Sequence, residues 1–178
     1  MSLRRSLNLG VVIGIVVVGL AQSPASARHD DAVVAAKIAS AMSAARPPIA
    51  DQGMILDNKV DDAGHFIVLR EGRIGWFCFP DNPASPGNDP QCLDQTWLDW
   101  KYAHLAGEEP DITTMGIAYM LQGGSDASPN DPFAMEPAPG EDWVGSPSHI
   151  RLLVPRAIAP SIFTAGQLVG DASIMWTG

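Results

Sequence analysis

Residues 73–106 read RIGWFCFPDNPASPGNDPQCLDQTWLDWKYAHLA, and this stretch decides the expected fold. Its first part (73–79) is apolar and aromatic, which is typical of a β-strand. The string HFIVLR (65–70) just before it also predicts a strand, and Glu71-Gly72 suits a tight turn between the two. We therefore expect a β-hairpin. Residues 80–91 contain four prolines and no apolar period, and they predict an ordered loop.

A helix is predicted directly after this loop, over residues 94–106. Asp94 is a residue type that commonly caps helix N-termini, and Gly107 is one that commonly ends helices. Three ring-bearing residues of the segment fall on one helix face, which predicts that this face packs against the hairpin. They are Trp97, Trp100 and His104.

The rest of the sequence adds short elements to this centre. We expect a helix over 32–45 and strands over 54–56, 113–121, 150–154 and 172–176, with a second long loop over 122–140. Adjacent short strands with two helices indicate an α+β fold, with a small antiparallel sheet, two main helices and two long ordered loops.

The N-terminus has the pattern of a secretory signal peptide over residues 1–27. Arg4 and Arg5 precede an apolar run, and Ala25-Ser26-Ala27 is a small-x-small cleavage site. The alternative is a membrane anchor, but the uninterrupted apolar run from Gly10 to Ala21 is short for a span of about 30 Å. We expect a single mature domain, residues 28–178, in the periplasm or secreted, without a stable membrane anchor.

The charge of the chain limits the partners it can bind. The full sequence has a net charge of −9, and the predicted mature part keeps 9 basic against 20 acidic residues. Such a surface repels phosphate backbones, so nucleic acid is not an expected partner. Cations, neutral sugars and basic partners remain open.

Both cysteines, Cys78 and Cys92, lie in the predicted mature domain. In an oxidising compartment such a pair predicts a disulfide that closes the Pro-rich loop. A thiolate metal site and a catalytic cysteine are the alternatives.

Oxygen-bearing side chains are concentrated in the two long loops, and Asn-Asp-Pro occurs once in each. Each such tripeptide can be a simple turn, because Asx side chains bond to nearby backbone amides. Alternatively, the oxygens could bind a divalent cation such as Ca²⁺. The residues concerned are Asp81, Asn82, Asn88, Asp89 and Asp94, and Asp126, Asn130 and Asp131.

Gly123-Gly124-Ser125-Asp126 follows a predicted strand, and its successive amides could form an anion-binding nest. A Ser125 nucleophile assisted by Asp126, with His149 or His104 as base, is a further hypothesis. A third combines two histidines that open strands, His65 and His149, with a loop carboxylate as a metal site. The alternative for these histidines is a hydrogen bond to the backbone.

Three strings of the sequence resemble an uncharacterised family of exported bacterial proteins. They are GWFCFPDNPASPGNDPQCLD (75–94), YMLQGGSDASPNDPFA (119–134) and SHIRLLVP (148–155), and the resemblance covers about residues 53–178. It implies no known activity, fold or cofactor.

The leading functional hypothesis is binding of a small polar ligand or cation by loops 80–94 and 122–132. A hydrolase or metal-dependent enzyme is the alternative, and a structural envelope protein is the second. For the binding site we expect the two loops to lie side by side. The predicted ligand-binding residues are Asp81, Asp89, Asp94, Ser125, Asp126 and His149.

Overall fold

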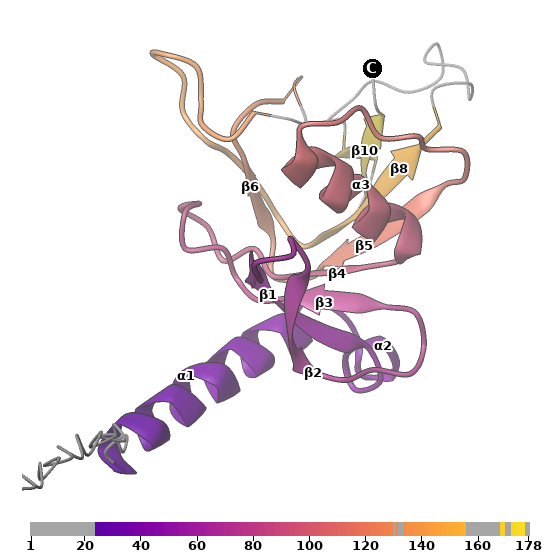
Figure 1. The fold of residues 1–178 in the computed structure, drawn as a ribbon. Helices are drawn as coiled ribbons and strands as arrows, with labels where there is room; N and C mark the ends of the chain where they lie inside the picture. Colours follow the sequence, from indigo (N-terminus) through magenta and orange to yellow (C-terminus); the bar gives the residue numbers. More distant parts are fainter. Residues whose placement is uncertain (1–23, 130, 132–133, 156–167, 170–171, 177–178) are drawn as a thin grey trace, which may run out of the picture.

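The computed structural model describes residues 24–129, 131, 134–155, 168–169 and 172–176, and these form an α+β fold (Figure 1). The helices are α1 (Pro24–Met42), α2 (Pro47–Ala50) and α3 (Gln95–Ala106). The strands are β1 (Met54–Val60), β2 (Phe66–Arg70), β3 (Phe77–Phe79), β4 (Gln91–Leu93), β5 (Gly116–Met120), β6 (Gly124–Asp126), β7 (Val144–Ser146), β8 (His149–Val154), β9 (Leu168–Val169) and β10 (Ala172–Trp176). The part of the signal prediction that covers residues 1–23 lies outside the described residues.

Eight strands form one sheet in the order β2-β1-β3-β4-β5-β8-β10-β9, while β6 and β7 form a separate antiparallel pair. The large sheet is mainly antiparallel, but β3 is parallel to β1 and β10 is parallel to β8. The sheet is therefore larger and more mixed than the sequence suggested.

The predicted hairpin between 65–70 and 73–79 is wrong. Strand β2 pairs antiparallel with β1, and β3 pairs with the other side of β1. The hairpin is β1–β2, and its turn is stabilised by the Asp61 carboxylate, which accepts hydrogen bonds from the amides of Ala63 and His65. Gly64 adopts a left-handed φ of 83° there. The sequence did not predict this pairing because β1 continues as far as Val60, although the segment after Leu56 is polar.

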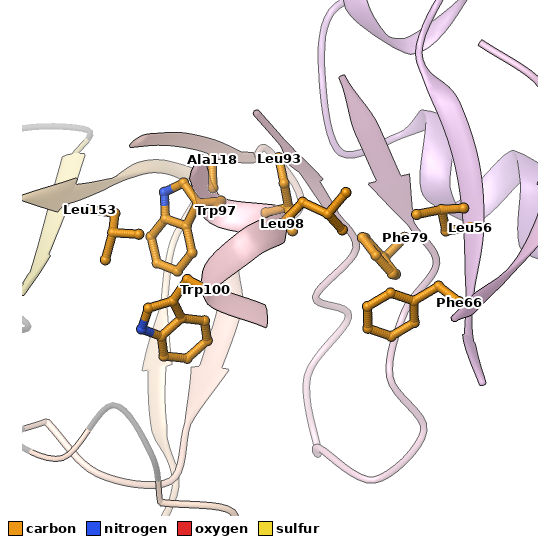
Figure 2. Packing of buried hydrophobic residues seen from close by; sticks show 9 residues of the cluster. All are labelled: Leu56, Phe66, Phe79, Leu93, Trp97, Leu98, Trp100, Ala118 and Leu153. Atoms are coloured by element: carbon orange, nitrogen blue, oxygen red, sulfur yellow. The ribbon is translucent and has the colours of Figure 1, made fainter. Parts of the chain in front are cut away.

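The strand residues alternate between two apolar layers, as the pleat of a sheet requires. One face packs against α3 (Figure 2) and contains Leu56, Phe66, Phe79, Leu93, Trp97, Leu98, Trp100, Ala118 and Leu153. The other packs against the C-terminal part of α1 and contains Ala41, Ala44, Ala45, Ile55, Cys78 and Cys92. The N-terminal half of α1 extends away from the sheet in Figure 1, and residues 28–36 are exposed.

The disulfide prediction is confirmed, since Cys78 and Cys92 are bonded. They are directly opposite each other on β3 and β4, with 4.0 Å between their Cα atoms, and both are fully buried. The bond holds both ends of loop 80–90 at one place in the sheet. Closing a loop of this length contributes about 3 kcal/mol in the chain-entropy account.

The predicted helix over 94–106 is also confirmed. The Asp94 side chain accepts a hydrogen bond from the Trp97 amide at 3.0 Å, and Gly107 ends the helix at a left-handed φ of 69°. The indoles of Trp97 and Trp100 are buried in the core, 3% and 8% exposed, as the helix face predicted.

The segment 122–140 differs from the expected long loop, because β6 forms within it and pairs with β7. Helix α1 begins at Pro24, so the predicted cleavage site after Ala27 falls within its first turn. None of the helices in the described ranges is long and apolar enough to span a membrane.

Replacing Trp97 by Ala should lower the free energy of unfolding by about 3–5 kcal/mol, because it leaves a cavity between α3 and the sheet. Leu105→Ala, on the same helix, is the control, since Leu105 is 53% exposed. Urea denaturation of both variants measures the difference. Equal losses of stability would show that the Trp97 indole is not part of the core.

Candidate functional site

Three strand ends meet at one edge of the large sheet. Strands β3 and β5 run in the same direction because each is antiparallel to β4, and β8 runs opposite to β5. The C-terminal ends of β3 and β5 therefore lie at the same edge as the first residue of β8, and Met120 pairs directly with His149. We call this edge, with loop 80–90, segment 121–128 and residues 147–151, the rim.

Loop 80–90 is organised by two aspartates, Asp81 and Asp89, whose carboxylates accept hydrogen bonds from other groups of the loop. The Asp89 amide donates to the Asp81 carboxylate at 2.8 Å. The Asp89 carboxylate accepts from the Asn82 amide at 3.2 Å and from the Ser85 hydroxyl at 2.6 Å. Burial raises the pKa of Asp89, and Asp81 raises it further, while the two bonds it accepts oppose the shift. The oxygens of Asp89 are thus used to hold the loop, which favours the turn interpretation over the cation interpretation.

The same loop is hydrogen-bonded to two other elements, strand β1 and helix α1. The Asn58 side-chain amide, on β1, donates to the carbonyls of Pro80 at 3.0 Å and Asp81 at 3.2 Å. The Asp81 amide donates to the Ser40 hydroxyl of α1 at 3.0 Å. The loop is therefore an ordered part of the rim, as predicted.

The two loops are in contact, which confirms that they lie side by side. A Cβ atom added to Gly87 would stand 2.2 Å from the Ser125 hydroxyl oxygen. A side chain at position 87 would force the Ser125 hydroxyl to move. The contact shows that the two loops are adjacent, and it does not by itself assign a function to this surface.

Strand β6 presents its neighbouring residues to opposite sides. Ser125 faces Gly87, whereas Gly124 and Asp126 face β8. A Cβ on Gly124 would lie 3.1 Å from the His149 ring and 3.4 Å from the Arg151 guanidinium, so the absent side chain makes room for both. Asp126 accepts from Arg151 at 2.5 Å.

His149 is 1% exposed and uses both ring nitrogens. Nδ1 lies 2.6 Å from the Pro147 carbonyl, and Nε2 lies 3.2 Å from Nε of Arg151. Because the carbonyl only accepts and Arg151 only donates, the ring is the neutral Nδ1–H tautomer. Burial lowers the pKa of His149, and the charge of Arg151 lowers it further, while the Pro147 carbonyl and Asp126 oppose this.

Arg151 was missed by the sequence reasoning, although it is the centre of this network. It lies two residues after His149 on β8, and this period-2 spacing was the signal that could have identified it. Its side chain is 13% exposed, and two of its five N–H donors are used by Asp126 and His149. The other donors have no partner among the described residues.

Lys101 was also missed. Its Nζ lies over the aromatic pair of the core, 4.7 Å from the Phe79 ring centre and 6.0 Å from that of Phe66. Burial and then the charge of Arg151 lower the pKa of Lys101 to about 8, while Asp89 opposes the shift. The available signal was a lysine four residues after Trp97, on the apolar face of a predicted helix.

Five of the six predicted site residues belong to the rim, namely Asp81, Asp89, Ser125, Asp126 and His149. Asp94 lies at the other end of β4, where its carboxylate caps α3 and accepts from the Ile117 amide at 2.6 Å. That position makes it a structural residue, not part of the rim.

The two other candidate histidines do not join the rim. His65 is exposed beside the β1–β2 turn, and His104 stacks on Trp100 with 5.2 Å between ring centres. In the described ranges, no group of three or more His, Cys, Asp or Glu side chains is arranged to hold a metal ion. Asn130 lies outside the described residues.

No protein-family profile, curated protein or solved structure matches this chain.

The Gly87–Ser125 contact gives a test by compensation. Gly87→Ala should lower the free energy of unfolding by about 1–3 kcal/mol, because the new methyl group overlaps the Ser125 hydroxyl. Adding Ser125→Ala should recover most of that loss, since it removes the overlapping oxygen. Thermal or urea unfolding of the single and double variants measures the coupling. Simple additivity of the two substitutions would contradict the contact.

The lowered pKa of Lys101 predicts a pH dependence of stability. Between pH 8 and 10.5 the unfolded state binds more protons than the folded state, so the free energy of unfolding rises with pH there. We expect the wild type to gain about 1–3 kcal/mol over this range relative to Lys101→Met. Lys59→Met is the control, because Lys59 is exposed and should leave the rise intact. Parallel pH curves for wild type and Lys101→Met would contradict the shift.

Proposed function

We propose that this protein binds a small polar ligand at the rim. The observation that supports this best is where the buried polar groups lie. Among the described residues, the buried polar or charged side chains are Asp57, Asp89 and His149, and two of the three, Asp89 and His149, belong to the rim. Asp57 lies in the middle of β1, where its carboxylate is 2.5 Å from Nζ of Lys37 on α1, and it directly precedes Asn58, which holds loop 80–90.

Burying polar groups is unfavourable unless they are hydrogen-bonded, so their collection at one edge needs a reason. Ligand sites are usually preformed, with a few fixed polar groups that set orientation. The rim has this character, because Asp126 and His149 hold Arg151 in one position. The Arg151 side chain is 13% exposed, so it is partly open to solvent.

The geometry favours binding over the hydrolase alternative. Ser125 and Asp126 face opposite sides of β6, so they cannot act together on one substrate atom. His149 has its Nε2 occupied by Arg151, which leaves no basic nitrogen directed at Ser125. A structural envelope protein without a ligand remains the competing outcome of the experiment below.

We further propose that the mature protein acts in the periplasm or after secretion. The buried disulfide points to an oxidising compartment outside the cytoplasm. The acidic mature chain supports the proposal that nucleic acid is not a partner, and signal cleavage would leave no stable membrane anchor.

The test is a screen of small polar compounds against the mature protein by thermal shift, followed by amide NMR titration of those that stabilise it. We expect the shifted amides to lie in residues 80–90, 121–128 and 147–151. The exposed turn 61–65 is the internal control and should not shift. A screen in which no compound stabilises the protein, or shifts confined to other surfaces, would refute rim binding and favour the structural alternative.

A further inference from the structure

A groove lies between the β1–β2 turn and helix α3. Its volume is about 630 Å³, which is within the range of small-ligand sites. One wall is formed by the turn and includes Val60, Gly64 and His65, and the other is one face of α3 and includes Tyr102 and Leu105. The described residues that line it include none of the rim. The groove is therefore a second, separate place where a small molecule can be held.

The spacing of the two walls is fixed by contacts between them. The Tyr102 ring packs on the Phe66 ring with 5.0 Å between their centres, and the Tyr102 hydroxyl accepts from the Phe66 amide at 3.4 Å. On the turn, the Asp61 carboxylate accepts from the amides of Ala63 and His65, each at 2.9 Å. A groove whose walls are already held in this way needs little further ordering when a ligand enters.

The lining combines apolar side chains with carboxylates. Val60 and Leu105 are 41% and 53% exposed, so each wall presents hydrocarbon to solvent. The charged residues of α3 in the lining are Asp99 and Glu108, and the described residues that line the groove include no lysine or arginine. The lysine of α3, Lys101, is not part of the lining, and its Nζ lies 4.7 Å from the centre of the Phe79 ring.

The charges around the groove favour a cation. Asp99 and Glu108 are negative, and the C-terminal end of α3, which stops at Gly107, adds the partial negative charge of a helix terminus. Among the described lining residues only His65 can become positive, and its Nδ1 lies 3.9 Å from the Asp61 carboxylate, which offsets that charge. The excess of 20 acidic over 9 basic residues in the predicted mature chain acts in the same direction.

We propose that this groove binds an organic cation, an ammonium group attached to an aromatic or branched apolar body. The apolar body contacts Val60 and Leu105, and the ammonium lies beside the Glu108 carboxylate. The Tyr102 ring can contribute further, because the face of an aromatic ring attracts a cation. This site goes beyond the proposed function, since it shares no residue with the rim.

The experiment is an amide NMR titration of the mature protein at pH 7 with three probes that share a phenylethyl body. They are phenethylamine, phenethyl alcohol and phenylpropionate, which are positive, neutral and negative. Low ionic strength is used because salt screens exposed charges. We expect phenethylamine to bind about threefold or more tightly than the alcohol, and phenylpropionate to bind most weakly. The shifted amides should lie in residues 60–65 and 99–108.

Glu108→Gln should weaken the binding of phenethylamine by about two- to fivefold, the effect of one exposed ion pair, and leave that of phenethyl alcohol unchanged. Glu71→Gln is the matched control, because it removes the same charge from an exposed residue at the other end of β2. It should leave the dissociation constants of both probes unchanged.

An alcohol that binds as tightly as the amine would overturn the assignment of a cationic ligand. Equal affinities of the wild type and Glu108→Gln for phenethylamine, or equal weakening by Glu108→Gln and Glu71→Gln, would overturn the role of this carboxylate and with it the site. Absence of phenethylamine binding, or shifts confined to other surfaces, would also overturn the proposal. None of these results decides the rim proposal, which is tested by its own compound screen.

Discussion

The covalent bond between Cys78 and Cys92 fixes the centre of this structure. It joins directly opposed residues on β3 and β4, so it fixes the register of these two strands and the two ends of loop 80–90 together. Residues on either side of each cysteine point the other way, toward α3, and place Phe79 and Leu93 in the main core. The disulfide thus lies between the two apolar layers. It also holds loop 80–90 at the edge where β5 ends and β8 begins.

The elements with strong local signals could be predicted from the sequence. Helix α3 has a capping aspartate, a terminating glycine and an aromatic face, and each of these acts within a few residues of its own position. Strand pairing could not be obtained in the same way. The two strands on either side of Glu71-Gly72 suggested a hairpin, but both pair with β1 instead. The length of β1 was underestimated because its second half, Asp57–Val60, is mostly polar. The observed pairing buries Leu56 and Phe66 in one cluster. This stabilisation depends on tertiary packing, so no local sequence pattern predicts it.

The candidate site shows the same division. Asp89, Asp126 and His149 were found because carboxylates and histidines near loops are recognisable residue types. Lys101 and Arg151 were missed because each is an ordinary residue of a helix or a strand until folding places it beside its own partners. Asp94 was included because its residue type suits a ligand site, although the same carboxylate suits a helix cap equally well. Only the direction of β4, which carries Asp94 away from the rim, separates the two roles.

Lys101 is an unusual residue for its position over the Phe79 ring of the core. A lysine at this position must lose part of its hydration, and the neighbouring Arg151 makes its charged form less favourable still. A methionine would fill the space over Phe79 without either disadvantage, so packing alone does not account for a lysine here. The network around Arg151 is similar, since two polar side chains, Asp126 and the buried His149, hold its guanidinium in one position. Polar groups that are held in fixed positions at a cost in stability are a feature of ligand sites, and the Arg151 network at the rim has that feature.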